Sequence, residues 1–462
     1  MKQSIRRLAI AMEAAFAIVA LFAGYWSLWR APGLLAREDN PRRVLAEQHI
    51  QRGQILDRNG VILARSTVID GIASREYLVP GAAPVVGYYS LRYGASGIED
   101  QYDSLLRGDT SGTFWQRLWD GLLHRDPTGG DVRLTLDAEV QQTAATLLAG
   151  QQGAIVVIAV PSGKVLAMAS APTYDPNMLE ENWDALRDDP SAPLLNRATQ
   201  GLYQPGASLE SIILGVAINS GEAKLNDPAH GSQSETTDGS ILPCAANNRV
   251  PFTMTEAYLF ACPAPFEMLG EILGPSTLNA ALSDFGLYES PAFALPVDFS
   301  EPHLVGTEPS AGQIAIGQGD LTVTPLHMAR VVAAFANHGQ MPPLTLVSET
   351  RIAGMPWQAN QPDGTPRGTI SPVNADAVSA LMAEAVRSGA AQEAALPARS
   401  VLGHAGLALT GPDDTLSAWF LGFVPLANGE SYVVAVLLED TPNASNAASL
   451  GGQILQAAIN SR

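Results

Sequence analysis

Lysine is scarce in this chain of 462 residues, where it occurs only as Lys2, Lys164 and Lys224. Arginine supplies most of the positive charge, and 27 basic against 46 acidic residues give a formal net charge of −19. This acidic balance argues against binding to nucleic acid and against a basic surface attracted to anionic lipids. Arginine does not release its proton in proteins, so a reaction that needs a lysine base has few candidates here.

Cysteine is rarer still, since the chain contains only Cys244 and Cys262. The sequence has no Cys/His spacing typical of a metal site, no phosphate-binding glycine loop and no tandem repeat. We therefore expect no metal and no cofactor. If the chain is exported, two cysteines so close in sequence suit a disulfide, and two buried free thiols suit the sequence nearly as well.

Long apolar runs are absent except near the N-terminus, where residues 8–29 are long enough to cross a bilayer. Lys2, Arg6 and Arg7 precede this run, so we expect a single-pass protein of the cytoplasmic membrane with its N-terminus inside and most of the chain outside. A cleaved signal peptide is the alternative.

Two features of this segment refine the expectation. Trp26 and Trp29 form an aromatic belt at its end, which favours a retained anchor over a cleaved one. Glu13 is the only ionisable residue within the run. A carboxylate at that depth either faces a protein partner or reaches back to the inner headgroups, and the sequence leaves both readings open.

The length indicates two or three structural units. We expect an anchor over residues 1–30, a small β-rich domain over residues 31–125, which we call the pedestal, and a larger α+β domain over residues 131–462. In the pedestal, Asn59-Gly60 predicts a hairpin. The larger domain opens with a strand at 131–137, a helix at 138–148 and a strand pair about the turn 161–163.

The stretch 203–211 has the layout of a nucleophile site without its chemistry. A Pro-Gly turn leads into an apolar helix, so the residue after the glycine lies at the helix N-terminus, where backbone N–H groups stabilise negative charge. A lysine one helical turn further on would lie on the same face and accept the nucleophile's proton. These two positions hold Ala207 and Glu210 instead, and one turn on from Ser208 stands Ser211, which is no base.

This stretch resembles the Tyr-x-Pro-Gly-Ser-Thr-Phe-Lys segment of the class B penicillin-binding proteins, the D,D-transpeptidases of the bacterial cell wall. Ala207 then matches the serine and Glu210 the lysine. The resemblance extends over roughly residues 50–108 and 131–455. Its other segments are Arg52–Ala64, Gly94–Gly108, Tyr174–Asn177, Gly312–Ala329 and Ser417–Pro425.

The two other family motifs are altered as well. In the Ser-x-Asn motif, Ala261 takes the place of the serine and Pro263 that of the asparagine. In Lys-Thr-Gly, the matching residues are His404, Ala405 and Gly406. We expect Glu210 to place an anion where the family has a cation, and His404 to offer at most a partial positive charge below about pH 6.5.

The resemblance implies the penicillin-binding transpeptidase fold, with an antiparallel central sheet flanked by helices. It also implies a noncatalytic scaffold or regulator in peptidoglycan synthesis, whose partner is a polytopic glycosyltransferase. Two alternatives remain. One is an active transpeptidase that uses Ser208 or Ser211, and the other is a module that binds the peptidoglycan stem peptide without covalent chemistry.

Overall fold

The computed structural model describes residues 2–26, 49–69, 72–109, 128–236, 239–246, 250–302, 310–410 and 415–462. Helix α1 (Lys2–Tyr25) contains an apolar stretch, Ile5–Tyr25, that is long enough to cross a membrane. This agrees with the predicted span of residues 8–29, of which residues 27–29, including Trp29, lie outside the described part.

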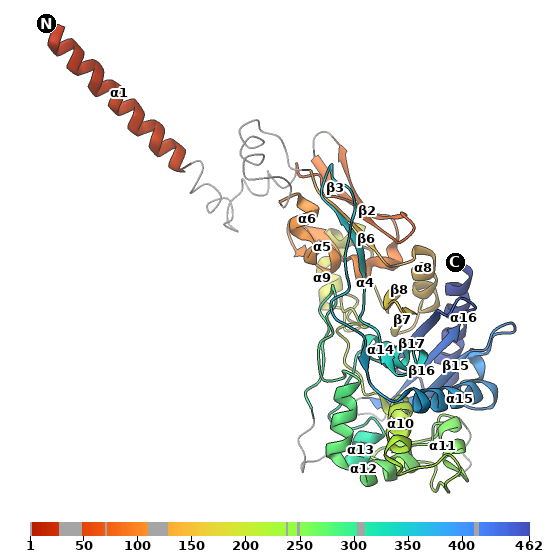
Figure 1. Ribbon diagram of the computed structural model, residues 1–462. Coiled ribbons are helices and arrows are strands. Elements are labelled where there is room, and N and C mark those ends of the chain that lie inside the picture. Colours follow the sequence, from red (N-terminus) through yellow and green to blue (C-terminus); the bar gives the residue numbers. More distant parts are fainter. Residues whose placement is uncertain are drawn as a thin grey trace.

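The pedestal is built on short strands and helices (Figure 1). The predicted hairpin at Asn59-Gly60 is confirmed, since β1 (Ile55–Leu56) pairs antiparallel with β2 (Ile62–Ile69). The Asp57 carboxylate fixes the turn by accepting from the Asn59 and Val61 amides, each at 2.8 Å. The other elements in the described part of the pedestal are β3 (Ile72–Tyr77), η2 (Pro80–Ala82), α4 (Ala83–Val86), β4 (Tyr89–Ser90), β5 (Gly94–Ala95), α5 (Gly97–Gln101) and α6 (Asp103–Arg107).

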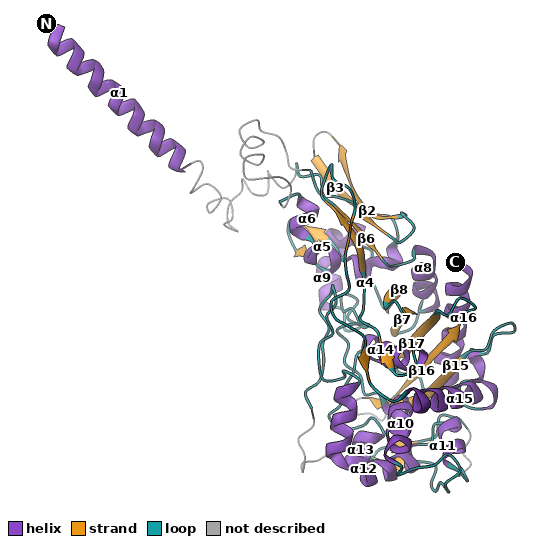
Figure 2. Cartoon of the chain, viewed as in Figure 1, coloured by secondary structure: helices purple, strands orange, loops and turns teal. Residues whose placement is uncertain are grey.

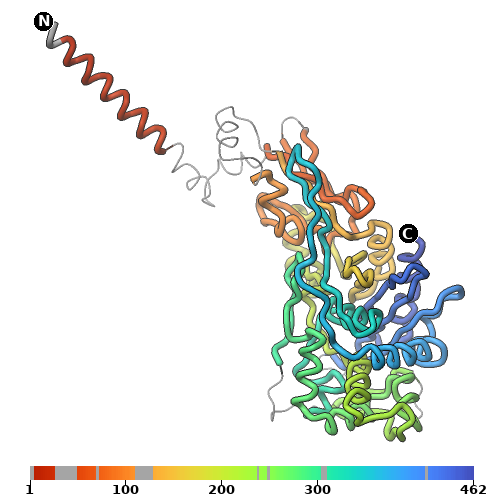
Figure 3. Tube along the Cα trace, in the orientation of Figure 1, coloured from red at the N-terminus to blue at the C-terminus, as the bar shows by residue number. Residues whose placement is uncertain are grey.

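One sheet joins the pedestal to the larger domain. Its strand order is β13-β12-β6-β1-β2-β3, where β6 is Asp131–Leu134, β12 is Val347–Arg351 and β13 is Gln358–Ala359. In Figure 3 the teal-blue chain around residue 350 therefore runs up beside the orange pedestal strands. The strand predicted to open the larger domain thus pairs on one side with the pedestal strand β1. The domain boundary itself stays a prediction.

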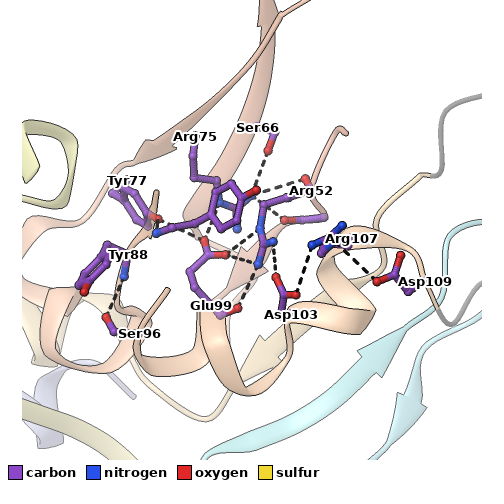
Figure 4. A network of polar contacts seen from close by, with 12 residues as sticks. Arg52, Ser66, Arg75, Tyr77, Tyr88, Ser96, Glu99, Asp103, Arg107 and Asp109 are labelled. Carbon is purple, nitrogen blue, oxygen red and sulfur yellow. Dashed lines mark hydrogen bonds and ion pairs between the residues drawn. The ribbon is translucent and has the colours of Figure 1, made fainter. Parts of the chain in front are cut away.

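A buried ion-pair network holds the pedestal together (Figure 4). The Glu99 side chain is fully buried and lies 2.9 Å from the Arg52 guanidinium and 2.6 Å from that of Arg75. Asp103 gives Arg52 a second carboxylate partner at 2.6 Å. Because a buried charge without a partner is very unfavourable, this network fixes how the strands and α5 pack.

The pedestal also bonds directly to the larger domain. The Asn177 side chain accepts from the Tyr77 backbone N–H and donates to the Tyr77 carbonyl, both at 2.9 Å. Asn177 belongs to one of the segments that carry the family resemblance. Two reciprocal bonds of this kind orient one domain on the other.

The core of the larger domain is a five-stranded antiparallel sheet in the order β15-β16-β17-β7-β8. The predicted strand pair about residues 161–163 is confirmed as β7 (Gly153–Val160) and β8 (Lys164–Ala171). The other strands are β15 (Leu402–Thr410), β16 (Thr415–Pro425) and β17 (Ser431–Leu438). Nearly all their residues are buried, because helices pack against the sheet (Figure 2).

The helices that contact this sheet include α8 (Ala138–Leu147), α14 (Pro325–Ala336), α15 (Pro372–Ser388) and α16 (Ala444–Asn460). The predicted helix at 138–148 is confirmed as α8, and α14 begins at Pro325 with Thr324 as its N-cap. The remaining elements are η3 (Pro176–Met178), α9 (Leu179–Asp188), η4 (Gly206–Leu209), α10 (Glu210–Ser220), β9 (Ser234–Glu235), β10 (Ile241–Leu242), α11 (Met254–Phe260), α12 (Pro263–Asp284), α13 (Ala311–Ala315), β11 (Gln340–Met341), β14 (Arg367–Gly368) and η5 (Gln392–Ala394).

Candidate active site

The altered nucleophile segment lies between the sheet and α10. A short 3₁₀ turn, η4, follows Pro205 and runs directly into α10. The predicted apolar helix is therefore α-helical only from Glu210 onward. Gly206 takes a φ of +55°, and a Cβ atom there would lie 2.2 Å from the Leu407 carbonyl oxygen of β15. Only glycine allows η4 to pack this closely on the strand.

Ala207 and the edge strand β15 are in direct contact. A Cβ atom built on Gly406 would lie 2.8 Å from the Ala207 Cβ, and the Ala207 carbonyl accepts a hydrogen bond of 3.2 Å from His404 Nε2. Ala207 and Ala405 are 1% and 0% exposed. The first and third altered motifs therefore meet, and the methyl group of Ala207 supplies no nucleophile.

Glu210 and His404 face each other where the family motifs have two lysines. Glu210 Oε2 lies 3.3 Å from His404 Nε2, and both side chains are fully buried. Neither carboxyl oxygen nor His404 Nδ1 has a hydrogen-bond partner among the described residues. Two ionisable groups with so little solvation favour their neutral forms.

Burial shifts both pKa values away from charge. It raises the pKa of Glu210 well above its usual value and lowers the pKa of His404 to about 4. Burial therefore disfavours the anion expected at position 210. It also moves the partial positive charge expected on His404 below about pH 6.5 to a lower pH.

Tyr258 closes the pair from the side of α11, and the sequence analysis did not identify it. Its ring stacks on that of His404 with centroids 4.3 Å apart and planes 23° apart. Its hydroxyl lies 2.8 Å from Ser211 Oγ, and burial raises the pKa of Tyr258. The only signal in the sequence was its place in the helix that precedes Ala261. An aromatic residue in such a helix is usually part of the hydrophobic core.

The two serines considered as substitute nucleophiles are occupied. Ser208 is 1% exposed, and its Oγ donates to the Pro205 carbonyl at 2.6 Å. Ser211 is 2% exposed and bonds to Tyr258, as described above. Neither hydroxyl has a basic side chain as its hydrogen-bond partner, so nothing in this arrangement activates them.

The second altered motif forms the junction of two helices. Ala261 ends α11 in the left-handed region with a φ of +48°, and Pro263 is the first residue of α12. Cys262, between them, forms a disulfide with Cys244. Ala261 is fully buried and Pro263 presents a ring, so this junction offers neither a hydroxyl nor an amide to a substrate.

Taken together, the positions that match the family site form a buried contact between η4, the start of α10, the junction of α11 with α12, and β15. Three cavities are described at the contacts of the pedestal with the larger domain. Among the described residues no group of His, Cys, Asp or Glu side chains is placed to hold a metal ion.

Two families match the chain. Residues 153–459 match the penicillin binding protein transpeptidase domain, and residues 52–132 match the penicillin binding protein A dimerisation domain. The peptidoglycan D,D-transpeptidase PbpA of Mycolicibacterium smegmatis is 32% identical, over 95% of this chain and 94% of that protein. The PbpA of Mycobacterium tuberculosis is 31% identical over 99% of both.

Solved structures agree with these matches. The ceftriaxone acyl-enzyme complex of penicillin-binding protein A from M. tuberculosis superposes with a TM-score of 0.80 at 30% identity, covering 90% of this chain and 100% of that one. Pseudomonas aeruginosa PBP2 gives 0.73 at 27% identity, covering 88% and 95%. With the order of the strands and the family match over most of the chain, these likenesses show that the chain belongs to the class B penicillin-binding protein family of peptidoglycan transpeptidases.

Proposed function

We propose that this protein is a noncatalytic member of its family, which acts as a scaffold or regulator of peptidoglycan synthesis. The observation that carries the proposal is the buried Ala207–Glu210–His404 contact, which contains no nucleophilic hydroxyl and no lysine. Acyl transfer by this family layout requires an activated hydroxyl beside a proton acceptor. Here a methyl group and a neutral acid take those places.

The preserved parts support a structural role. The chain keeps an apolar N-terminal helix that fits a single-pass anchor, and it keeps the pedestal with its buried Glu99 network. We propose that the N-terminus lies inside the cell and that the anchor and pedestal contact a polytopic glycosyltransferase. The transpeptidase-like domain then transmits or limits that partner's activity without turning over substrate.

The two alternatives have less support. An active enzyme would need Ser208 or Ser211, whose hydroxyls are buried and bonded to the Pro205 carbonyl and to Tyr258. Binding of a stem peptide in the former cleft would need access to His404, whose side chain is 0% exposed. Either role would require the contact between η4 and β15 to open.

A complementation experiment in the native host tests the proposal. Cells deleted for the protein receive either the wild type or the double variant Ser208→Ala/Ser211→Ala, and wall synthesis is followed by incorporation of labelled precursor. We expect both genes to restore synthesis equally, while a chain lacking residues 1–30 does not. If the double variant folds normally and fails to restore synthesis, the unorthodox enzyme is the better account.

A further inference from the structure

A groove that lies outside the family site opens where the pedestal meets the larger domain. It has a volume of about 470 Å³ and is lined by residues of the turn after β1, of β6, of the turn between β7 and β8 with the start of β8, of β12 and of the end of β13 with the chain after it. We call it the junction groove. Its size is within the range of sites for small molecules, about 300–1,000 Å³.

Two cations in the junction groove have no acidic partner. Arg58 and Lys164 both line it and are both exposed, and no carboxylate lies within ion-pair distance of either among the residues that the structure describes. Lys164 is one of only three lysines in a chain of net charge −19. Unpaired positive charge concentrated in one hollow is therefore unusual for this protein and favours an anionic ligand.

Two carboxylates near the groove already have partners. Glu349, which also lines it, pairs with Arg133, whose guanidinium lies 4.3 Å from the centre of the Trp357 ring. Asp57, next to Arg58, accepts from the Asn59 and Val61 amides in its own turn. These carboxylates do not neutralise the two free cations.

Uncharged polar groups complete the lining. Ser162, Ser348 and Asn360 contribute hydroxyl and amide groups to the same hollow. The Ser348 hydroxyl donates to the Arg133 carbonyl at 3.0 Å, so its oxygen is turned to accept further bonds. Hydroxyl and amide groups can form hydrogen bonds with the N–H and C=O groups of a polar ligand. The two cations can form charge-assisted hydrogen bonds with its anionic groups.

We propose that the junction groove binds a small polar ligand with two anionic groups, which Arg58 and Lys164 hold. In an extracytoplasmic wall-synthesis protein, that chemistry has two sources. The groups are the carboxylates of a peptidoglycan stem peptide, or the phosphates of a lipid-linked wall precursor. The proposal does not depend on whether the family site is catalytic, so either conclusion can fail alone.

Isothermal titration of the full-length protein in detergent tests it with two probes, a synthetic stem tripeptide with free carboxylates and inorganic pyrophosphate. We expect one or both to bind, and Arg58→Gln or Lys164→Gln to weaken that binding about three- to tenfold each, as for the loss of one charge-assisted bond. The preferred probe identifies the source. Raising the salt concentration should weaken binding as well.

The matched control is Lys224→Gln/Arg399→Gln, which removes one exposed lysine and one exposed arginine outside the groove. Circular dichroism confirms that each variant is folded. The proposal is overturned if neither probe binds at concentrations up to about 10 mM, a limit that corresponds to a very weak site. It is also overturned if Arg58→Gln/Lys164→Gln binds as the wild type does, or if the control loses as much affinity.

Discussion

The buried histidine of the family site should make the protein sensitive to acid, and His404→Phe should remove part of that sensitivity. Burial lowers the pKa of His404 from 6.5 to about 4 in the folded state. Between those values the unfolded chain binds a proton that the folded chain does not. The contribution of neutral His404 to the free energy of unfolding is therefore complete above about pH 6.5 and is lost as the pH falls towards 4.

The size of the effect follows from the shift. At 1.36 kcal/mol for each pKa unit, the fall from 6.5 to about 4 corresponds to about 3 kcal/mol of unfolding free energy. Glu210 acts in the opposite sense: burial raises its pKa, so its contribution is fully present below the usual value and is lost as the pH rises through the raised value. The buried His327, whose pKa is also lowered to about 4, adds an acid-sensitive contribution that the variant retains.

Phenylalanine keeps the ring that stacks on Tyr258 and removes the titrating nitrogen. It also leaves the Ala207 carbonyl without its donor, which should lower stability by about 1–3 kcal/mol at every pH. This destabilisation does not change with pH. The further loss of stability between pH 6.5 and 4 should be about 3 kcal/mol smaller in the variant than in the wild type.

Urea unfolding of residues 31–462 at a series of pH values measures this difference, with the fluorescence of the buried Trp419 as one reporter. Tyr258→Phe is the control, because it removes the bond to Ser211 and leaves the histidine in place, so it should keep the wild-type pH slope. A His404→Phe variant that loses as much stability as the wild type between pH 6.5 and 4 would refute the reasoning, because Glu210 and His327 contribute equally to both proteins.

Three further predictions concern other parts of the structure. Reducing the Cys244–Cys262 disulfide, which closes a separation of 18 residues, should lower stability by about 3 kcal/mol, and melting with and without reductant checks this. Glu99→Gln leaves two buried arginines short of charge and should cost about 3–5 kcal/mol, measured by urea unfolding; a change below 1 kcal/mol would contradict the role given to the network. Ala207→Ser combined with Glu210→Lys should not restore reaction with penicillin, because the new cation would be buried against His404; an adduct in the mass spectrum would show that the site opens readily.

Local patterns allowed most of the fold to be predicted. Asn59-Gly60 specifies a hairpin through its turn chemistry, and Thr324-Pro325 marks the start of a helix. The pairing of β6 with β12 was beyond this reasoning, because these strands are about two hundred residues apart in sequence and no local pattern encodes such a partner.

In the candidate site, too, some features could be predicted from the sequence and others could not. The resemblance assigned Ala207, Glu210 and His404 to one family site, and the structure places them in contact. The charge expected on Glu210 and His404 took no account of their complete burial, which a single sequence does not reveal. Tyr258 was missed because its role arises from stacking on a residue of a distant strand.

The central claim, that the family site does no acyl transfer, is tested most directly by the intact mass of the purified full-length protein after incubation with excess penicillin. The account predicts an unchanged mass, because Ala207 has no hydroxyl and the Ser208 and Ser211 hydroxyls are buried and bonded. A stoichiometric adduct of the mass of penicillin would contradict it, and peptide mapping would then identify the serine that reacts.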